Sequence, residues 1–345
     1  MKKQLLALAA LAALSGVAAA QSVTIYGVVD GGLQYTSKDG GTTAYKNGGL
    51  SPSILGFKGS EDLGGGLKAN FNLEAHLSTE TGATGDWGGT FGRQANVGVS
   101  GSFGAVALGK QYTPAVLAFA ATDPRGLKET NSGLMTWAYS AGTSNTQIDV
   151  FAAKAVSYNT QVSGVNLGLL YGVGGVAGDA TAGRQVSAGL TYAGPVTLSA
   201  AYHQAYGTTL AAGHKTSQKY SVGVGYTLGA ATFKANYMSG KSYDGTTGAL
   251  SADYGVYGLG VNYALNTANT LTVAYYSGDK KNTADGRVNS YIVSNDYALS
   301  KRTTVYGLVG VAEAGSTAGA GGAAIESFAA NKSVTVLQLG VKHSF

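Results

Sequence analysis

Four charged residues gather in one stretch of the chain where their types and spacing could act on a passing solute. Asp123, Arg125, Lys128 and Glu129 lie within the segment 113–149, and they combine acidic with basic groups. Where such charges stand beside a narrow aqueous path, low-dielectric walls focus their field, and the charges discriminate between cations and anions. We expect these four residues to reach a constriction. The alternative is that some of them face bulk water or a neighbouring subunit.

Glu74 and His76 are the pair that most invites a metal-binding or acid–base interpretation, because they stand two residues apart. The chain has four histidines and no cysteine, and no third ligand follows at helical or turn spacing. We therefore interpret both as water-facing wall residues. No serine, histidine and aspartate combine at a spacing typical of a hydrolase, so the chain is not expected to be an enzyme or to bind a cofactor or a metal.

The elements that must position these side chains are β-strands with a strict two-residue alternation. Successive side chains of a strand point to opposite faces of the sheet. In the segment 67–78 one face is apolar and the other is polar, and the residues are Leu67, Ala69, Phe71, Leu73, Ala75 and Leu77 against Lys68, Asn70, Asn72, Glu74, His76 and Ser78. The segment 334–345 repeats the pattern and ends on Phe345.

Sixteen such strands can be placed along the chain, and the connections between them alternate between short and long. The long connections are 38–50, 79–91, 113–149, 174–183, 206–217, 242–253, 279–287 and 314–332. Short turns on one side and long loops on the other are typical of an outer-membrane barrel. The sequence thus predicts an all-β fold, a 16-stranded antiparallel transmembrane β-barrel with an aqueous lumen. The third long connection, 113–149 (loop 3), is the only candidate to fold into that lumen.

Composition favours the barrel over a soluble β-sandwich. The chain has 54 glycines among 345 residues, 22 tyrosines and 12% charged residues, and its polar faces carry few of the Lys and Glu residues that keep a soluble sheet in solution. The charged residues on these faces have mixed signs, which favours a transverse field over a single-sign filter, and we predict that they line the pore: Lys58, Lys68, Glu74, His76 and Lys234. Tyrosines near strand ends are expected to include interfacial girdle residues, and the candidates are Tyr35, Tyr112, Tyr171, Tyr192, Tyr206, Tyr226, Tyr263 and Tyr276.

The first twenty residues predict a signal peptide that is removed on export. Lys2 and Lys3 precede a short apolar run, and small residues follow before Gln21. The mature barrel is then expected to span 21–345. The net charge of +5 is spread along the chain, which does not favour a nucleic-acid partner.

Several motifs resemble those of the trimeric general porins of β-proteobacterial outer membranes, and the resemblance covers all of 21–345. They are SVTIYGVVDGG at 22–32, LGFKGSEDLGGGLKA at 55–69, FGRQA at 91–95, LGKQYT at 108–113 and the terminal Phe345. The resemblance implies a homotrimer in the bacterial outer membrane, surrounded by lipid and lipopolysaccharide, with loop 3 inside the lumen. It also implies insertion by the barrel assembly machinery, which reads Phe345 as its signal.

The resemblance further implies a row of wall arginines opposite acidic groups of loop 3, and the chain departs from this row. Arg93 keeps the family residue, but Ile54, Lys110 and Ser157 stand at positions where relatives carry arginine. We predict Arg93 and Lys110 at the constriction, although alternation alone places both on apolar faces. Lys110 can face the lumen only if Gly109 allows a bulge. These departures favour weak ion selectivity of either sign.

The leading hypothesis is a channel for passive diffusion of ions and small hydrophilic solutes, filtered by charge and size at loop 3. A solute-specific channel, for instance for an organic anion, would instead show conductance block that saturates. A barrel enzyme would need a catalytic set near the outer rim. An adhesin or structural barrel with a closed lumen would show no conductance.

Overall fold

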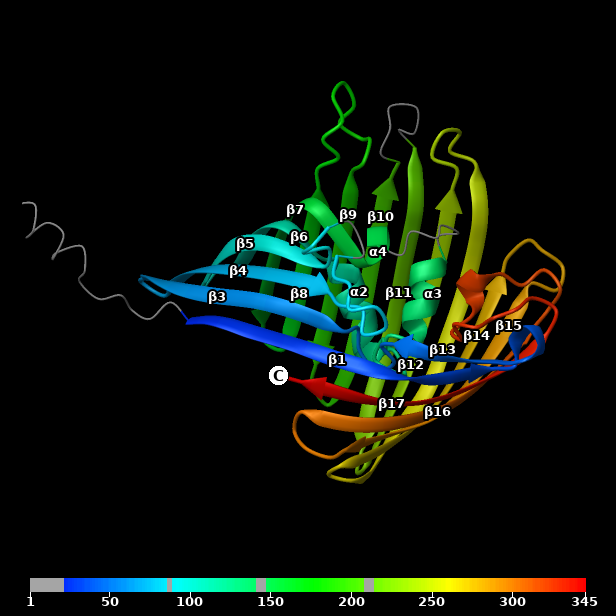
Figure 1. The fold of residues 1–345 in the computed structure, drawn as a ribbon. Coiled ribbons are helices and arrows are strands. Elements are labelled where there is room, and N and C mark those ends of the chain that lie inside the picture. The colour runs from blue at the N-terminus through cyan, green and yellow to red at the C-terminus, as the bar shows by residue number, and fades with distance from the viewer. Residues whose placement is uncertain (1–21, 86–88, 141–146, 208–213) are drawn as a thin grey trace, which may run out of the picture.

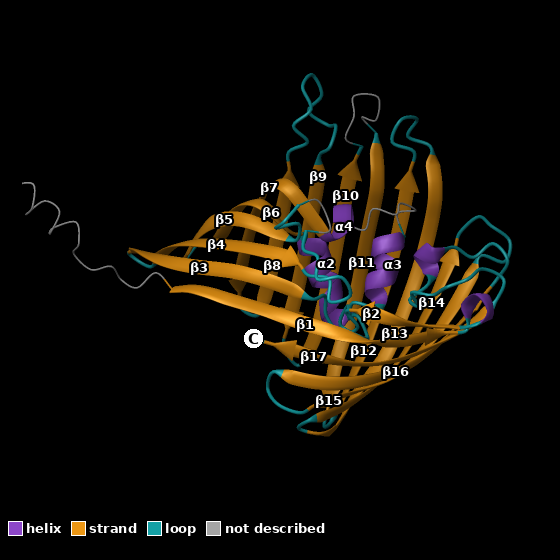
Figure 2. Ribbon diagram, in the orientation of Figure 1, coloured by secondary structure: helices purple, strands orange, loops and turns teal. Residues whose placement is uncertain are grey.

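The computed structural model describes residues 22–85, 89–140, 147–207 and 214–345. Its strands form one closed antiparallel sheet, which surrounds the helices in Figures 1 and 2. The signal peptide predicted at 1–20 lies outside the described residues. The strands are β1 (Ser22–Thr36), β2 (Thr42–Asn47), β3 (Ile54–Gly64), β4 (Leu67–His76), β5 (Gln94–Gly101), β6 (Gly104–Tyr112), β7 (Phe151–Val162), β8 (Val165–Gly172), β9 (Gln185–Ala193), β10 (Val196–Tyr206), β11 (Lys215–Leu228), β12 (Ala231–Tyr243), β13 (Leu250–Asn266), β14 (Asn269–Lys280), β15 (Arg287–Ala298), β16 (Thr303–Ala314) and β17 (Ser333–Ser344).

The barrel has sixteen strands, as predicted, because β2 and β3 are two halves of one wall strand. Both halves pair with β1, which lies between them and β17, and the β1–β17 pairing closes the cylinder. The predicted loop 38–50 is therefore wrong in part, since Thr42–Asn47 forms β2. The wall strand leaves the sheet only at 48–53. The glycines and the proline of that segment are turn signals, and they obscured the short strand that precedes them.

Alternation along the strands separates a lipid-facing exterior from a polar interior. On β11, Val222 and Val224 are exposed on the outer surface, whereas Lys219 and Ser221 are buried inside. The connections also follow the prediction, with short turns such as 163–164 at one end of the barrel and long loops at the other. Two predicted girdle tyrosines are exceptions, because Tyr276 is buried and Tyr112 lines an internal cavity.

Among the described residues, no helix has both the length and the apolar character needed to cross a membrane.

The described part of loop 3, residues 113–140 and 147–149, folds into the lumen and contains α2 (Pro114–Thr122), α3 (Gly133–Tyr139) and the start of α4 (Gln147–Val150). Figure 2 shows α2 and α3 in purple, enclosed by the strands. Pro114 starts α2 at a position where its missing N–H costs no hydrogen bond. The ring of Phe119 stacks on Trp137 at 5.1 Å, which joins α2 to α3. Loop 3 is therefore a compact body that rests on the inner wall.

Two glycines of the wall allow α2 to lie directly on the sheet. A Cβ atom added to Gly189 would stand 2.1 Å from the Pro114 carbonyl oxygen, and one added to Gly168 would stand 2.8 Å from Pro114 Cβ. The neighbouring backbone N–H of Ala115 donates to Ser187 Oγ at 3.0 Å. Small wall residues thus fix the height of α2 above the sheet.

We expect Gly189→Ala to lower the free energy of unfolding by about 1–3 kcal/mol, because α2 must move away from the wall. Gly225→Ala is the matched control, since its added Cβ would meet only an ordinary contact at 3.4 Å. Urea unfolding of both variants in lipid vesicles makes the comparison. Equal stability of the two variants would contradict this account of α2.

A second loop also enters the barrel, which the sequence interpretation did not predict. The connection 315–332, with the 3-10 turn η3 (Ala320–Gly322), places Ala324 and Ile325 in a buried apolar cluster with Val288 and Val336. The prediction that loop 3 is the only segment to fold into the lumen was therefore wrong. The sequence did contain an indication of this packing. Val334 and Val336 lie on the otherwise polar, inward face of β17, and two apolar side chains there need an apolar segment packed against them.

Candidate functional site: the constriction

The candidate constriction is a cavity of about 330 Å³ between loop 3 and wall residues of β2, of β6 and of the approach to β5. Among the described residues, its lining contains two cations and two carboxylates, which are Lys46, Arg93, Glu129 and Glu326. They come from β2, the approach to β5, loop 3 and the connection 315–332. Four segments that are distant in sequence therefore meet at one narrow point.

Arg93 lies in the lumen and is held by a carboxylate and by aromatic rings. Its Nε is 2.6 Å from Glu74 Oε1, and Tyr26 donates its hydroxyl to Glu74 Oε2 at 3.0 Å. Arg93 also donates to the Tyr112 hydroxyl, and its guanidinium lies 5.1 Å from the ring centroid of Phe151. Alternation alone had placed Arg93 on an apolar face. That rule does not apply to Arg93, because β5 begins at Gln94 and Arg93 precedes the strand.

Lys46 and Glu326 both line this cavity, and they form an ion pair with each other. Asn131 of loop 3 accepts a hydrogen bond from the Glu326 backbone N–H at 3.1 Å. The connection 315–332 therefore reaches loop 3 and also contributes a charge to the constriction. Sequence reasoning missed both residues, because each was assigned to a loop on the outside.

Glu129 is the cavity carboxylate that forms no ion pair among the described residues. Its backbone N–H donates to Leu50 O at 3.4 Å, which ties loop 3 to the break in the second wall strand. Burial raises the pKa of Glu129, and the nearby charges of Arg93 and Lys46 oppose that shift only in part. This carboxylate is the least compensated charge of the constriction.

The other three charged residues predicted for the constriction instead fasten loop 3 to the wall. Asp123 is fully buried, and Tyr276 donates to its Oδ1 at 3.1 Å. Arg125 donates to Ser294 Oγ at 2.5 Å, and Lys128 Nζ lies 2.5 Å from Asp296 Oδ2. Alternation does not apply inside a loop, so the sequence could not show which loop charges face the pore.

A buried charge cluster at the end of loop 3 was also missed. Asp149 of α4 lies 2.5 Å from Lys219 Nζ and 3.0 Å from His203 Nε2, and Ser217 donates to it at 3.0 Å. Burial raises the pKa of Asp149, but the Lys219 ammonium and the His203 imidazole outweigh this and hold it well below its usual range. Lys219 also donates to Trp137 O, so the cluster links α4, α3 and the wall.

The structure also shows how the predicted wall residues are oriented. By register, Lys58 faces Asn72, Lys68 faces Ser100, and Lys234 faces two wall glycines, so all three share the inner face. Glu74 binds Arg93 as described, and His76 pairs opposite Ile54 on the same face.

Lys110 lies outside this constriction. Gly109 has φ +124°, but β6 keeps its alternation there, since the extra residue of the irregular pairing lies in β7; Lys110 therefore pairs opposite Ala95, on the face of the exposed Leu108. Gln111 turns inward instead and accepts a hydrogen bond from Ser157 Oγ at 2.6 Å. Ordinary alternation therefore directs the residue after Lys110 into the lumen.

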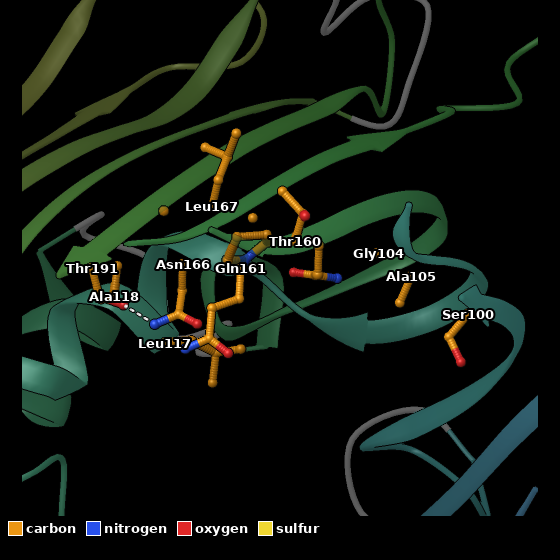
Figure 3. A pocket seen from close by; sticks show the side chains of 14 residues that line it. Ser100, Gly104, Ala105, Leu117, Ala118, Thr160, Gln161, Asn166, Leu167 and Thr191 are labelled. Atoms are coloured by element: carbon orange, nitrogen blue, oxygen red, sulfur yellow. Dashed lines mark hydrogen bonds between the residues drawn. The ribbon is translucent and has the colours of Figure 1, made fainter. Parts of the chain in front are cut away.

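A second cavity of about 450 Å³ lies below α2, toward the short turns. Figure 3 shows that amides and hydroxyls line it together with the apolar side chain of Leu117. Asn166 donates to Thr191 Oγ1 at 3.2 Å, drawn as the dashed line. No charged side chain is among the described residues of this lining. Charge is thus concentrated at the constriction above it.

Comparison with known proteins agrees with the barrel. The chain matches the family described as Gram-negative porin over residues 7–317. It is 32% identical to outer membrane porin protein 32 of Delftia acidovorans over 360 residues, covering 100% of both chains. It is 29% identical to an outer membrane porin protein of Bordetella pertussis, covering 89% of this chain and 93% of that one.

Solved structures give the same result. The anion-selective porin from Comamonas acidovorans superimposes with a TM-score of 0.81 at 27% identity, covering 94% of this chain and 100% of that one. The trimer form of OmpT from Vibrio cholerae has a TM-score of 0.70 at 16% identity over 94% of this chain and 100% of that one, which shows a shared fold. The chain belongs to the Gram-negative porin family, and it is an outer-membrane channel protein.

Proposed function

We propose that the constriction passes ions and small hydrophilic solutes with little preference for the sign of their charge. The observation that carries this proposal is the pairing of opposite charges in one cavity. Lys46 is bound to Glu326, Arg93 is bound to Glu74, and the carboxylate of Glu129 stands nearby. A permeating ion meets a transverse field, because cations and anions each find a favourable partner at the wall. No covalent step, metal or cofactor is part of this mechanism.

Solute flux across vesicles that contain the purified protein tests this function. For neutral sugars of increasing size, the swelling rate should fall with molecular size and rise linearly with concentration. A solute-specific channel is the second candidate, since the uncharged cavity below α2 presents amides to a passing solute. Flux that saturates for one solute class, with block of ion current by that solute, would replace the proposal with this second candidate.

The ion preference should depend on pH through Glu129. Because burial raises its pKa, Glu129 should become protonated at a higher pH than a glutamate with the ordinary pKa of about 4.3. Protonation removes the cavity carboxylate that repels anions and attracts cations, so anion preference should rise as pH falls. Reversal potentials across a KCl gradient at several pH values check this. The Glu129→Gln variant should show a smaller pH dependence, and an equal dependence in both proteins would assign the effect to another group.

We also infer a homotrimer that the barrel assembly machinery inserts into a lipopolysaccharide-containing membrane. Support for the trimer comes from the trimer form of the Vibrio cholerae relative and from the uneven wall, where β5 has 8 residues and β13 has 17. Phe345 closes the barrel, because its backbone exchanges hydrogen bonds with Gly27 at 3.1 and 3.2 Å. Its ring is exposed on the outside, where an assembly factor can reach it.

A further inference from the structure

Asp30 of β1 is a fully buried carboxylate that none of the constriction's ion pairs uses. It faces the segment 48–53, where the second wall strand leaves the sheet. We call residues 48–53 the wall break. Among the described residues, Asp30 takes part in no ion pair. A carboxylate removed from water needs hydrogen-bond donors, and here the wall break and one tyrosine supply them.

The two carboxylate oxygens of Asp30 have separate partners. The backbone N–H groups of Leu50 and Ser51 both donate to Oδ2, each at 2.9 Å. Tyr306 of β16 donates its hydroxyl to Oδ1 at 2.6 Å. Hydrogen bonds to a charged acceptor are stronger than those between neutral groups. The side chain of Asp30 therefore holds the middle of the wall break against the sheet.

The main chain of Asp30 holds both ends of the same segment. Its carbonyl accepts a hydrogen bond from the Gly48 N–H at 2.9 Å, and its N–H donates to Ser53 Oγ at 2.9 Å. Every one of these contacts involves a single residue of β1. The course of the wall break is thus set by Asp30 and not by pairing within the sheet.

The wall break in turn holds loop 3 beside the cavity. The Thr130 N–H donates to Gly49 O at 3.3 Å, and the Glu129 N–H donates to Leu50 O at 3.4 Å. The side chain of Glu129 is also close, because a Cβ atom added to Gly48 would stand 3.2 Å from Glu129 Cγ. The backbone position of Glu129 therefore depends on where the wall break lies.

The wall break also connects Glu129 with the opposite side of the constriction. Lys46 of β2 lies two residues before the break, and Asn47 and Pro52 line the cavity together with Lys46 and Glu129. Asp30 itself is not among the described residues of this lining. A residue that does not line the cavity thus holds the segment between a cation and a carboxylate that do.

We propose that Asp30 is a positioning residue of the constriction, which holds the wall break and thereby keeps Glu129 at the solute path. The inference rests on the proposed role of Glu129 in ion selectivity. In this account Asp30 contacts no solute and acts through the segment that it binds. The alternative is that Asp30 acts through its own negative charge, whose repulsion adds to the rise in the pKa of Glu129.

Two substitutions of Asp30 separate position from charge. Asp30→Asn removes the charge, but its carbonyl oxygen can accept from the Leu50 and Ser51 N–H groups, and its amide can donate to the Tyr306 hydroxyl. Asp30→Ala removes both the charge and the hydrogen bonds. Positioning predicts that Asp30→Asn behaves like the wild type, whereas an effect of charge predicts that the two variants behave alike.

The effect of Glu129→Gln on ion selectivity is the first measurement, made in the wild type and in both Asp30 variants. Reversal potentials in a KCl gradient at low salt should show a shift of about tenfold in the wild type and in Asp30→Asn. In Asp30→Ala the shift should fall to about threefold, because moving a charge from roughly 6 to roughly 12 Å from the path halves its energy. Equal shifts in all three proteins, or an equal reduction in both Asp30 variants, would overturn the proposal.

Hydrogen exchange of the Glu129 and Thr130 amides is the second measurement, and it does not depend on ion conduction. Asp30→Ala should speed their exchange at least ~10-fold, because opening of the wall break releases both N–H groups. Asp30→Asn should leave the rate unchanged. The Ala115 amide, which donates to Ser187 elsewhere on the wall, should exchange at the wild-type rate in every variant and shows that loop 3 is otherwise in place.

Gly49→Ala displaces the wall break while it leaves Asp30 intact, and it serves if Asp30→Ala does not fold. Its added Cβ would clash with the Tyr306 hydroxyl, whereas that of the control Gly225→Ala would meet only ordinary contacts. Gly49→Ala should therefore speed exchange of the Glu129 and Thr130 amides, and the control should not. Unchanged exchange in Gly49→Ala would overturn the proposal. Faster exchange in a channel whose selectivity ignores Glu129→Gln would instead count against the proposed function and leave the placement of Glu129 by Asp30 standing.

Discussion

Replacing Asp149 by leucine is expected to lower the free energy of unfolding by about 3–5 kcal/mol and to increase the noise of the open-channel current. The variant leaves Lys219 buried without its carboxylate, and removing one partner of a buried pair is strongly destabilising. Asp149 also ends loop 3, where its carbonyl accepts hydrogen bonds from Trp137 Nε1 at 3.1 Å and Thr113 Oγ1 at 2.9 Å. Urea unfolding in vesicles and single-channel recording measure the two effects.

The double variant Asp149→Leu/Lys219→Met is the control for this prediction. It removes both charges, so most of the lost stability should return, because a buried ion pair replaced by apolar groups is often nearly neutral. The two single variants should each be less stable than the double variant. Stability of Asp149→Leu within about 0.5 kcal/mol of the wild type would show that the cluster does not hold loop 3.

Replacing Glu129 by glutamine is expected to shift the ratio of anion to cation permeability about tenfold toward anions at low salt. A unit charge roughly 6 Å from an ion in water contributes about 0.7 kcal/mol, or about threefold for each ion, and the effects on anion and cation have opposite sign. The shift should shrink as salt rises, because screening shortens the range of the charge. Reversal potentials at two ionic strengths test both statements.

Asp285→Asn is the matched control for the Glu129 variant. Asp285 is an exposed carboxylate of the loop 281–286, and Ser316 donates hydrogen bonds to it at 2.6 and 2.8 Å. Its removal changes the net charge equally, and Asp285 does not line the cavity. If both variants shift the reversal potential equally, the overall charge of the protein sets selectivity, and the assignment of Glu129 to the constriction is wrong.

The barrel itself could be predicted from the sequence because alternation is imposed by physics at every strand. A residue such as Val222 must meet lipid and its neighbour Ser221 must not, so two-residue periodicity persists along the chain. The same rule gave the inner orientation of Lys58 and Lys234. The strand count followed from the alternation of short turns and long loops, which is typical of outer-membrane barrels.

The constriction could be predicted only in part, because its residues belong to segments without periodicity. Asp123 and Glu129 lie in one loop, yet the first is buried against Tyr276 and the second lines the cavity. Whether a charged residue of loop 3 is buried or lines the cavity depends on how loop 3 packs on the wall, which alternation does not describe. Lys46 and Glu326 were missed for the same reason, since they are distant in sequence and meet only when the connection 315–332 enters the lumen.

The resemblance to the porin family implies wall arginines at two positions where this chain carries uncharged residues. Ser157, at a position where the family pattern has arginine, donates to Gln111, and Ile54 shares the inner face with His76. These substitutions remove positive charge from the wall. Together with the ion pairs of Arg93 and Lys46 they leave the constriction close to neutral.

The reversal potential of the wild-type channel in a tenfold KCl gradient at pH 7 tests this neutrality most directly. We expect a value near zero, which corresponds to weak discrimination between potassium and chloride. A potential close to the limit for a pure chloride or a pure potassium channel would show that one sign of charge dominates the pore, and the balanced constriction would have to be abandoned.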